Sequence, residues 1–180
     1  PFAGDRLEER GLPGAVGADE PDHVAPVEDR AEPVEERAIT HHEPHVVALK
    51  ESSENVRRIT DIIAATGDRY RIFVGVDDLA LEGLMLGALG WVAGLVNAFP
   101  AESVALYRLA AAGRYTEARA LYRWFMPLLH LDTHIKFVHY IKLAQAMTGR
   151  GTEYLRAPRL PLHGEERARL TALIEAALES

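Results

Sequence analysis

The sequence predicts an α/β fold in which three parallel strands alternate with helices and lead into a helical extension. Two observations predict it. Three apolar runs of strand length are each followed by a stretch with helical periodicity, an order typical of right-handed βαβ units. After Gly113 the apolar pattern is helical only. The sheet therefore belongs to the first part of the folded region, and the last helices follow it.

Residues 1–44 differ in composition from the rest of the chain. They hold six of the ten prolines, and their twelve acidic and four basic residues give a net charge of −8, which leaves +1 for residues 45–180. Such a segment cannot bury enough apolar surface to offset the entropy of ordering it. We therefore predict a disordered or irregular segment at 1–44, a strand–helix region at 45–112 and a helical extension at 113–180.

The composition excludes several classes of function. The 180 residues include no cysteine, so disulfides and thiol nucleophiles are excluded and a reducing, cytoplasmic location is expected. No apolar run reaches the roughly 20 residues of a spanning helix, so no membrane association is expected. Basic residues form no stripe, and a nucleic-acid partner is therefore not expected.

The first strand is expected within His45–Ser53. Four apolar residues, Val46–Leu49, end in Lys50, a pattern typical of a buried parallel strand. The serine pair that follows indicates a turn into a crossover helix, for which Gly67 suits the position after the last turn. A lysine at the carboxyl end of such a strand lies where α/β proteins place their chemistry, although it can also simply extend into water.

The next two units repeat the strand–helix order. The second strand is expected at Tyr70–Val74 and the third at Trp91–Val96. Between them, Asp78 suits the N-cap of a helix over Leu79–Leu89. A further helix over Glu102–Ala112 follows the third strand.

The extension contains three predicted helices. The first runs over Thr116–Leu129, where Pro127 is expected to kink or shorten its end. The second is expected at His134–Met147. The last begins at Gly164.

Three histidines and an aspartate near the second of these helices could be interpreted as a metal site. They are His130, Asp132, His134 and His139. Asp132 would point away from the histidines if they shared one helix, so helix capping by Asp132 or Thr133 is the plainer interpretation. We expect neither a metal nor a cofactor.

Residues 46–180 resemble the carboxyl-terminal half of the dihydrodipicolinate synthase/N-acetylneuraminate lyase family of Schiff-base aldolases. Each matching piece is short, but their order and spacing agree with the family. The pieces are Val47–Ser53, Gly75–Asp78, Gly87–Val92 with Asn97 and Pro100, and Gly113–Ala118.

The resemblance implies a (β/α)8 TIM barrel, of which this chain holds about the last three βα units and the three-helix extension, assembled as a homo-oligomer. Lys50 falls at the position of the family's Schiff-base lysine, whose neutral amine attacks the keto carbon of pyruvate or a similar 2-oxo acid. Val92 matches a position whose backbone carbonyl lies near the substrate. Asp77 lies at the mouth where groups of the second substrate bind, with a helix cap as its alternative role.

This sequence also departs from the family pattern. A threonine-rich carboxylate-binding turn and a tyrosine proton relay belong to earlier strands, for which the chain has no room. Residues 1–44 contain no tyrosine and no strand-like run, so we expect them to be non-homologous and half of the active site to be missing. Three strands cannot close a barrel, so their edges and one face are expected to be exposed.

The expected function is therefore that of a Schiff-base lyase or aldolase acting on a small 2-oxo acid, with little activity in this chain alone. Gly75–Asp78 and Leu128–His134 are unlike typical lysine-biosynthesis members, so a catabolic relative, such as a hydroxypyrroline-carboxylate deaminase or a sugar-acid aldolase, is an alternative. A second alternative is a non-enzymatic remnant or helical interaction module, since Ala111–Tyr122 resembles a single tetratricopeptide helix pair.

Overall fold

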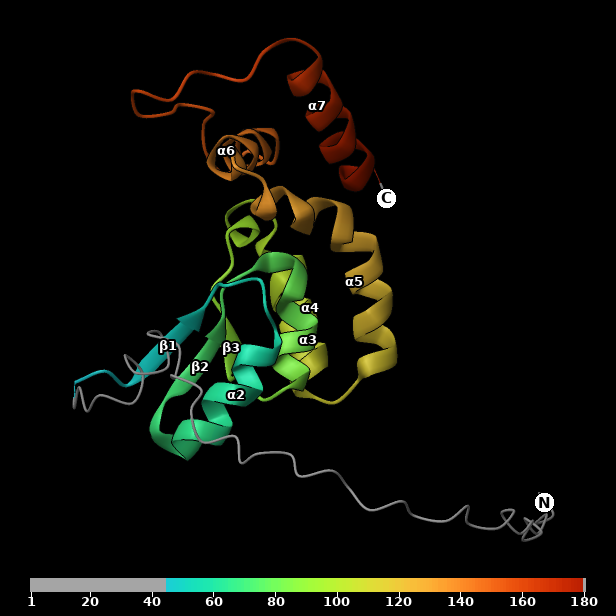
Figure 1. Cartoon of the computed structure of the whole chain (residues 1–180). Coiled ribbons are helices and arrows are strands. Elements are labelled where there is room, and N and C mark those ends of the chain that lie inside the picture. Colours follow the sequence, from blue (N-terminus) through green and yellow to red (C-terminus); the bar gives the residue numbers. More distant parts are fainter. Residues whose placement is uncertain (1–44, 180) are drawn as a thin grey trace, which may run out of the picture.

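A computed structural model describes residues 45–179 and is shown in Figure 1. The prediction that residues 1–44 are disordered or irregular lies outside these residues. Three parallel strands form one sheet in the order β1 (Ala48–Glu51), β2 (Arg71–Val74) and β3 (Gly90–Trp91). The pairing register sets Lys50 opposite Phe73. The predicted parallel sheet, with helices between its strands, is confirmed.

The third strand is shorter than the predicted Trp91–Val96. The backbone N–H groups of Gly94 and Leu95 donate to the carboxylate of Asp77, at 3.0 and 2.7 Å. They therefore do not extend the strand ladder, and the chain enters the short 3-10 helix η3 (Leu95–Asn97).

The helices follow the predicted order. Within residues 45–179 the α-helices are α2 (Arg57–Thr66), α3 (Ala80–Met85), α4 (Pro100–Ala111), α5 (Tyr115–Leu129), α6 (Phe137–Met147) and α7 (Gly164–Leu178). Single 3-10 turns form η1 (Gly67–Arg69), η2 (Asp77–Leu79) and η4 (His130–Thr133). Gly67 has φ +55° and ends α2, as predicted.

Helix α3 differs from the predicted Leu79–Leu89. The 3-10 turn η2 occupies its expected start, so Asp78 is not its N-cap, and no side-chain hydrogen bond caps α3. The helix also ends early, because Gly87 adopts φ +109° and turns the chain toward β3.

The second helix of the extension also starts later than predicted. Helix α6 begins at Phe137 rather than His134, because the backbone N–H of Lys136 donates to Nδ1 of His134 at 3.1 Å in the turn after η4. Pro127 lies in the last turn of α5 and does not shorten it, since the helix reaches the predicted Leu129.

The side chains of the sheet divide between a covered face and an open face. Helix α2 packs on the covered face through a cluster of buried apolar side chains. On the open face, Ala48 and Lys50 lie opposite Arg71 and Phe73, and of these four only Phe73 is half-buried. The predicted exposed face is therefore confirmed. The buried cluster on the covered face contains Ile59, Ile62, Ile72, Val74 and Ala88.

The expectation that Val46–Leu49 is buried is wrong. The side chain of Val47 is 62% exposed and that of Val46 is 38% exposed. In the described part of the chain, α2 covers only the later residues of the strand, where Leu49 packs against its cluster.

The larger core cluster joins α3 and α4 to the helices of the extension. Its fully buried members include Leu106 of α4, Phe125 of α5, Leu143 of α6 and Ile174 of α7. A turn at Gly113, with φ +70°, separates α4 from α5. The core is thus continuous across residue 113. No helix in the described residues is long and apolar enough to span a membrane.

Candidate active site

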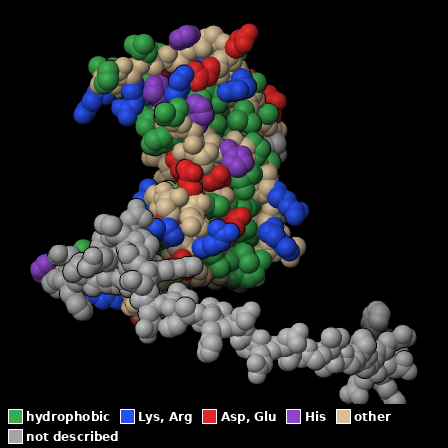
Figure 2. Space-filling model, in the orientation of Figure 1, with side chains coloured by type: hydrophobic (Ala, Val, Ile, Leu, Met, Phe, Trp, Pro, Cys, Tyr) green, Lys and Arg blue, Asp and Glu red, His purple; other side chains and the backbone are tan. Residues whose placement is uncertain are grey.

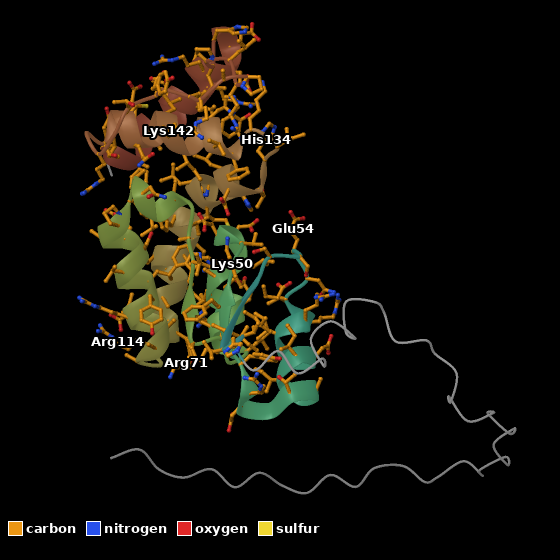
Figure 3. The ribbon with its side chains drawn as sticks, turned by 90° about the vertical axis from the view of Figure 1, so that its left-hand side faces the viewer. Lys50, Glu54, Arg71, Arg114, His134 and Lys142 are labelled. Atoms are coloured by element: carbon orange, nitrogen blue, oxygen red, sulfur yellow. The ribbon has the colours of Figure 1, made fainter. Side chains whose placement is uncertain are left out.

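Lys50 lies near the carboxyl end of β1 and points to the open face of the sheet. Figure 3 shows it in the middle of the molecule, between the sheet and the part of the extension that carries His134 and Lys142. Its side chain is exposed. The desolvation predicted from the preceding apolar run is therefore not provided by the described residues.

Gly75 provides the space that the Lys50 side chain occupies. It directly follows β2, and its backbone N–H donates to the carbonyl of Glu51 at 2.7 Å. A Cβ atom at Gly75 would lie 2.8 Å from Cε of Lys50 and would also clash with Oγ of Ser52. Only a glycine therefore allows Lys50 to lie along the end of β2.

Asp77 is completely buried and binds the loop that follows β3. Its Oδ1 accepts hydrogen bonds from Nε1 of Trp91 and the backbone N–H of Gly94, both at 3.0 Å. Its Oδ2 accepts the backbone N–H of Leu95 at 2.7 Å. Asp77 therefore holds the strand end and the start of η3, and it does not cap its own helix.

Burial raises the pKa of Asp77 to about 6. The backbone N–H of Leu95 opposes this rise, the negative charge of Asp132 adds to it, and the donors from Gly94 and Trp91 oppose it further. Removal of the carboxylate from water outweighs the three hydrogen bonds that favour its charged form. Asp77 therefore holds its proton at a higher pH than an ordinary aspartate.

Asp132 reaches the same end of the sheet from η4 of the extension. Its Oδ2 accepts the backbone N–H of Asp77 at 3.4 Å, and a Cβ atom at Gly94 would clash with its Oδ1. The expected capping by Asp132 or Thr133 is wrong, because no side chain caps η4 or α6 and the Thr133 hydroxyl donates to the carbonyl of His130. Local pattern could not indicate this contact, which joins residues 55 positions apart.

Val92 lies directly after β3. Its backbone N–H donates to the carbonyl of Val74 at 2.9 Å, and its side chain is 48% exposed. Because side chains alternate along a strand, Val92 shares the open face with Lys50 and Phe73. The three predicted site residues thus lie around one end of the sheet, with Asp77 buried and the other two exposed.

Two of the histidines near this end, His130 and His134, are engaged in other contacts. Nδ1 of His130 lies 2.9 Å from Oδ2 of Asp78. His134 stacks on the ring of Tyr140, with centroids 4.7 Å apart. Figure 2 shows acidic side chains, with a histidine beside them, between the sheet and the carboxyl-terminal helices. Within residues 45–179, no group of three His, Cys, Asp or Glu side chains is placed to hold a metal ion.

Comparison with curated proteins identifies a group of relatives. The profile of the dihydrodipicolinate synthetase family matches residues 34–177. A 4-hydroxy-tetrahydrodipicolinate synthase of Acidobacterium capsulatum is 33% identical over 130 residues, which are 72% of this chain and 43% of that protein. The corresponding protein of Syntrophobacter fumaroxidans is 32% identical over 133 residues, 73% of this chain and 46% of its own length. The chain thus spans less than half the length of these relatives.

Solved structures agree with this finding. The 4-hydroxy-tetrahydrodipicolinate synthase of Methylacidiphilum fumariolicum is 31% identical and superposes with a TM-score of 0.69 over 74% of this chain and 45% of that one. The dihydrodipicolinate synthase of Aquifex aeolicus is 27% identical, with the same TM-score and coverage. The described sheet and helices therefore correspond to part of a TIM barrel and its extension. The chain belongs to the dihydrodipicolinate synthetase family.

Proposed function

We propose that the protein is a Schiff-base-forming lyase or aldolase, in which the amine of Lys50 condenses with the keto carbon of pyruvate or a similar 2-oxo acid. The observation that carries this proposal is the position of Lys50. It lies at the carboxyl end of a parallel strand on the face that a closed barrel would enclose, beside a glycine that leaves room for it, in a chain of this family.

The chemistry follows from the amine. The neutral Nζ of Lys50 attacks the keto carbon, and the carbinolamine that forms loses its hydroxyl as water to give an iminium ion. The iminium accepts the electron pair of a neighbouring carbon–carbon bond as that bond breaks, and the reverse step makes the bond. We propose that the backbone carbonyl of Val92 lies near the bound 2-oxo acid and that Asp77 shapes the second-substrate side by fixing the loop after β3.

The second substrate belongs to the same proposal. We infer a catabolic 2-oxo acid reaction as the alternative to a biosynthetic one, because Gly75–Asp78 and Leu128–His134 are unlike the typical lysine-biosynthesis members of the family. The exposed Lys50 amine supports a low rate for this chain by itself, because an open site does not exclude water or strengthen electrostatic stabilisation.

Borohydride trapping with pyruvate tests the proposal, and the sequence makes it simple to analyse. The chain contains three lysines, Lys50, Lys136 and Lys142. We expect a reduced pyruvate adduct on Lys50 alone, detected by peptide mass mapping and absent from the Lys50→Ala variant. Lys136 and Lys142 serve as internal controls for nonspecific reaction. An adduct spread evenly over the three lysines, or none on the folded chain, would contradict the proposal.

A further inference from the structure

Two side chains approach the segment that follows β2 from opposite parts of the chain. Lys50 comes from β1, and its Cε lies against Gly75. Asp132 comes from η4, and its carboxylate accepts the backbone N–H of Asp77, two residues further along. The positive charge of Lys50 also acts on the carboxyl group of Asp132. The amine and the carboxylate therefore share the same end of the sheet.

The surroundings of Asp132 suit proton transfer. Burial raises its pKa above the ordinary value, while the N–H of Asp77 and the charge of Lys50 oppose the rise, and the charge of Asp78 adds to it. A carboxyl group with a raised pKa is a better proton donor and acceptor near neutral pH than an ordinary aspartate. Asp132 is also half-buried rather than enclosed, so its carboxylate can exchange protons with a reacting group or through one water.

We propose that Asp132 is the acid–base residue of the Lys50 site, supplied by the helical extension. The inference rests on the proposed Schiff-base function. Asp132 takes a proton from the Lys50 ammonium, which frees the lone pair of Nζ for attack on the keto carbon. As the new C–N bond forms, one proton of Nζ passes to the keto oxygen and gives the carbinolamine hydroxyl. Asp132 then gives its proton to that hydroxyl, the C–O bond breaks, and water leaves as the iminium forms. One proton moves out and back, so Asp132 ends the sequence in its starting form.

The other ionisable groups nearby are less suited to this role. Asp77 is completely buried, and both of its oxygens accept N–H donors. The carboxylate of Asp78 contacts the ring of His130. Glu51 faces the covered side of the sheet, where it accepts the backbone N–H of Ser53. Of these groups, Asp78 acts by its charge on Asp132, and the charge of Asp132 acts in turn on Asp77.

The test measures the rate of borohydride trapping with pyruvate, from pH 5 to pH 9, on the full chain and on three variants. We expect Asp132→Asn to slow trapping at pH 7 by at least tenfold and to flatten the pH profile, since acid–base groups contribute roughly 100-fold or more to such steps. Asp132→Glu should recover part of the rate. The matched control is Asp68→Asn, an exposed aspartate of η1 at the opposite end of the sheet, and its rate should equal that of the wild type.

A second measurement does not depend on pyruvate. In a carboxyl-carbon NMR titration, the pKa of Asp132 should rise in Lys50→Met, because the opposing positive charge is gone. Trapping by Asp132→Asn at the wild-type rate and with the wild-type pH profile would overturn the acid–base role and leave the Schiff-base function standing. Absence of any Lys50 adduct in the wild type would overturn both. An unchanged pKa of Asp132 in Lys50→Met would overturn the inference even if Asp132→Asn failed to fold.

Discussion

Asp77, which follows β2, holds the segment after β3 through its buried carboxylate, which accepts three N–H donors. Without the carboxylate, the N–H groups of Trp91, Gly94 and Leu95 would lose their acceptors, and each unpaired donor costs about 1–3 kcal/mol when it is buried. The hydrogen bonds offset much of the desolvation of the charge but not all of it, because the pKa is still raised. The contribution of Asp77 to the stability of the folded chain therefore depends on pH.

We expect Asp77 to make the chain less stable as the pH rises from about 4 to about 6. The pKa of Asp77 is about 6 in the folded chain and near 3.8 in the unfolded chain. Between these values the folded state binds the extra proton, so its stabilising contribution is complete below pH 3.8 and is lost as the pH passes 6. The loss amounts to about 3 kcal/mol. Urea unfolding at several pH values measures it.

The Asp77→Asn variant isolates this contribution, because the asparagine does not titrate. The difference in unfolding free energy between the wild type and Asp77→Asn should fall by about 2 kcal/mol between pH 4 and pH 7, most of the full loss, because the unfolded aspartate is already partly protonated at pH 4. Glu117 and Glu166, whose pKa values are lowered by ion-pair and hydrogen-bond partners, contribute with the opposite sign in both proteins and cancel. A difference that stays constant over this range would contradict the raised pKa of Asp77.

At the residue scale, the sequence predicted the position of Lys50 near a strand end but not the contact between Asp132 and Asp77. Lys50 follows a recognisable apolar run and matches a family motif, so its place near the strand end could be read locally. The contact of Asp132 with Asp77 depends on how η4 folds back over the sheet, and no local pattern encodes that approach. Asp78 shows the same difficulty, since its contact with His130 replaced the predicted helix cap.

At the scale of elements, helix α7 is attached to the core by a few buried side chains. Ile174 is completely buried and Leu170 is 3% exposed. An ion pair between Lys136 and Glu166 and a hydrogen bond from Tyr140 to Glu166 join α6 to the first turn of α7. The salt bridge is partly exposed and contributes little, so apolar burial provides most of the attachment.

We expect Ile174→Ala to lower the unfolding free energy by roughly 2–4 kcal/mol, through lost apolar burial and the cavity it leaves. Leu178→Ala on the same helix is the matched control, because Leu178 is 50% exposed and its truncation should cost less than about 1 kcal/mol. Chemical denaturation of the two variants measures the difference. Equal costs for both would show that α7 is not docked through Ile174.

Element boundaries were predictable where a glycine or the apolar periodicity sets them and not where a side chain accepts a backbone N–H at the boundary. Gly67 ends α2 as its position indicated, and α5 ends at the predicted Leu129. The early end of β3 depends on Asp77, and the late start of α6 depends on the ring of His134. In both cases a side chain accepts a backbone N–H that regular secondary structure would otherwise use. The periodicity of apolar residues does not indicate such contacts.

At the scale of the whole molecule, the sheet has an open face and free edges within the described residues. A groove of about 320 Å³ follows the outer edge of β3 and the side of α4, and most of its lining is apolar. Figure 1 shows α3, α4 and α5 to one side of the strands, and α6 and α7 beyond the upper end of the sheet. The residues that line this groove are Phe73, Leu89, Gly90, Trp91, Ala93, Val96, Ser103, Val104 and Tyr107. The resemblance predicted this exposure, since three strands of a barrel leave their inner face uncovered.

We expect this face to drive association of the purified chain with a second copy of itself. Unpaired parallel edges beside exposed apolar side chains favour strand pairing between chains. Sedimentation velocity over a range of concentrations should show a concentration-dependent oligomer. Phe73→Asp, which places a charge on the open face and in the lining of the groove, should shift the protein toward monomer. Ile135→Asp should not, although Ile135 is 92% exposed on the extension. If Ile135→Asp dissociates the oligomer and Phe73→Asp leaves it intact, the extension rather than the open sheet forms the interface, and the exposed strands would then need a different partner to cover them.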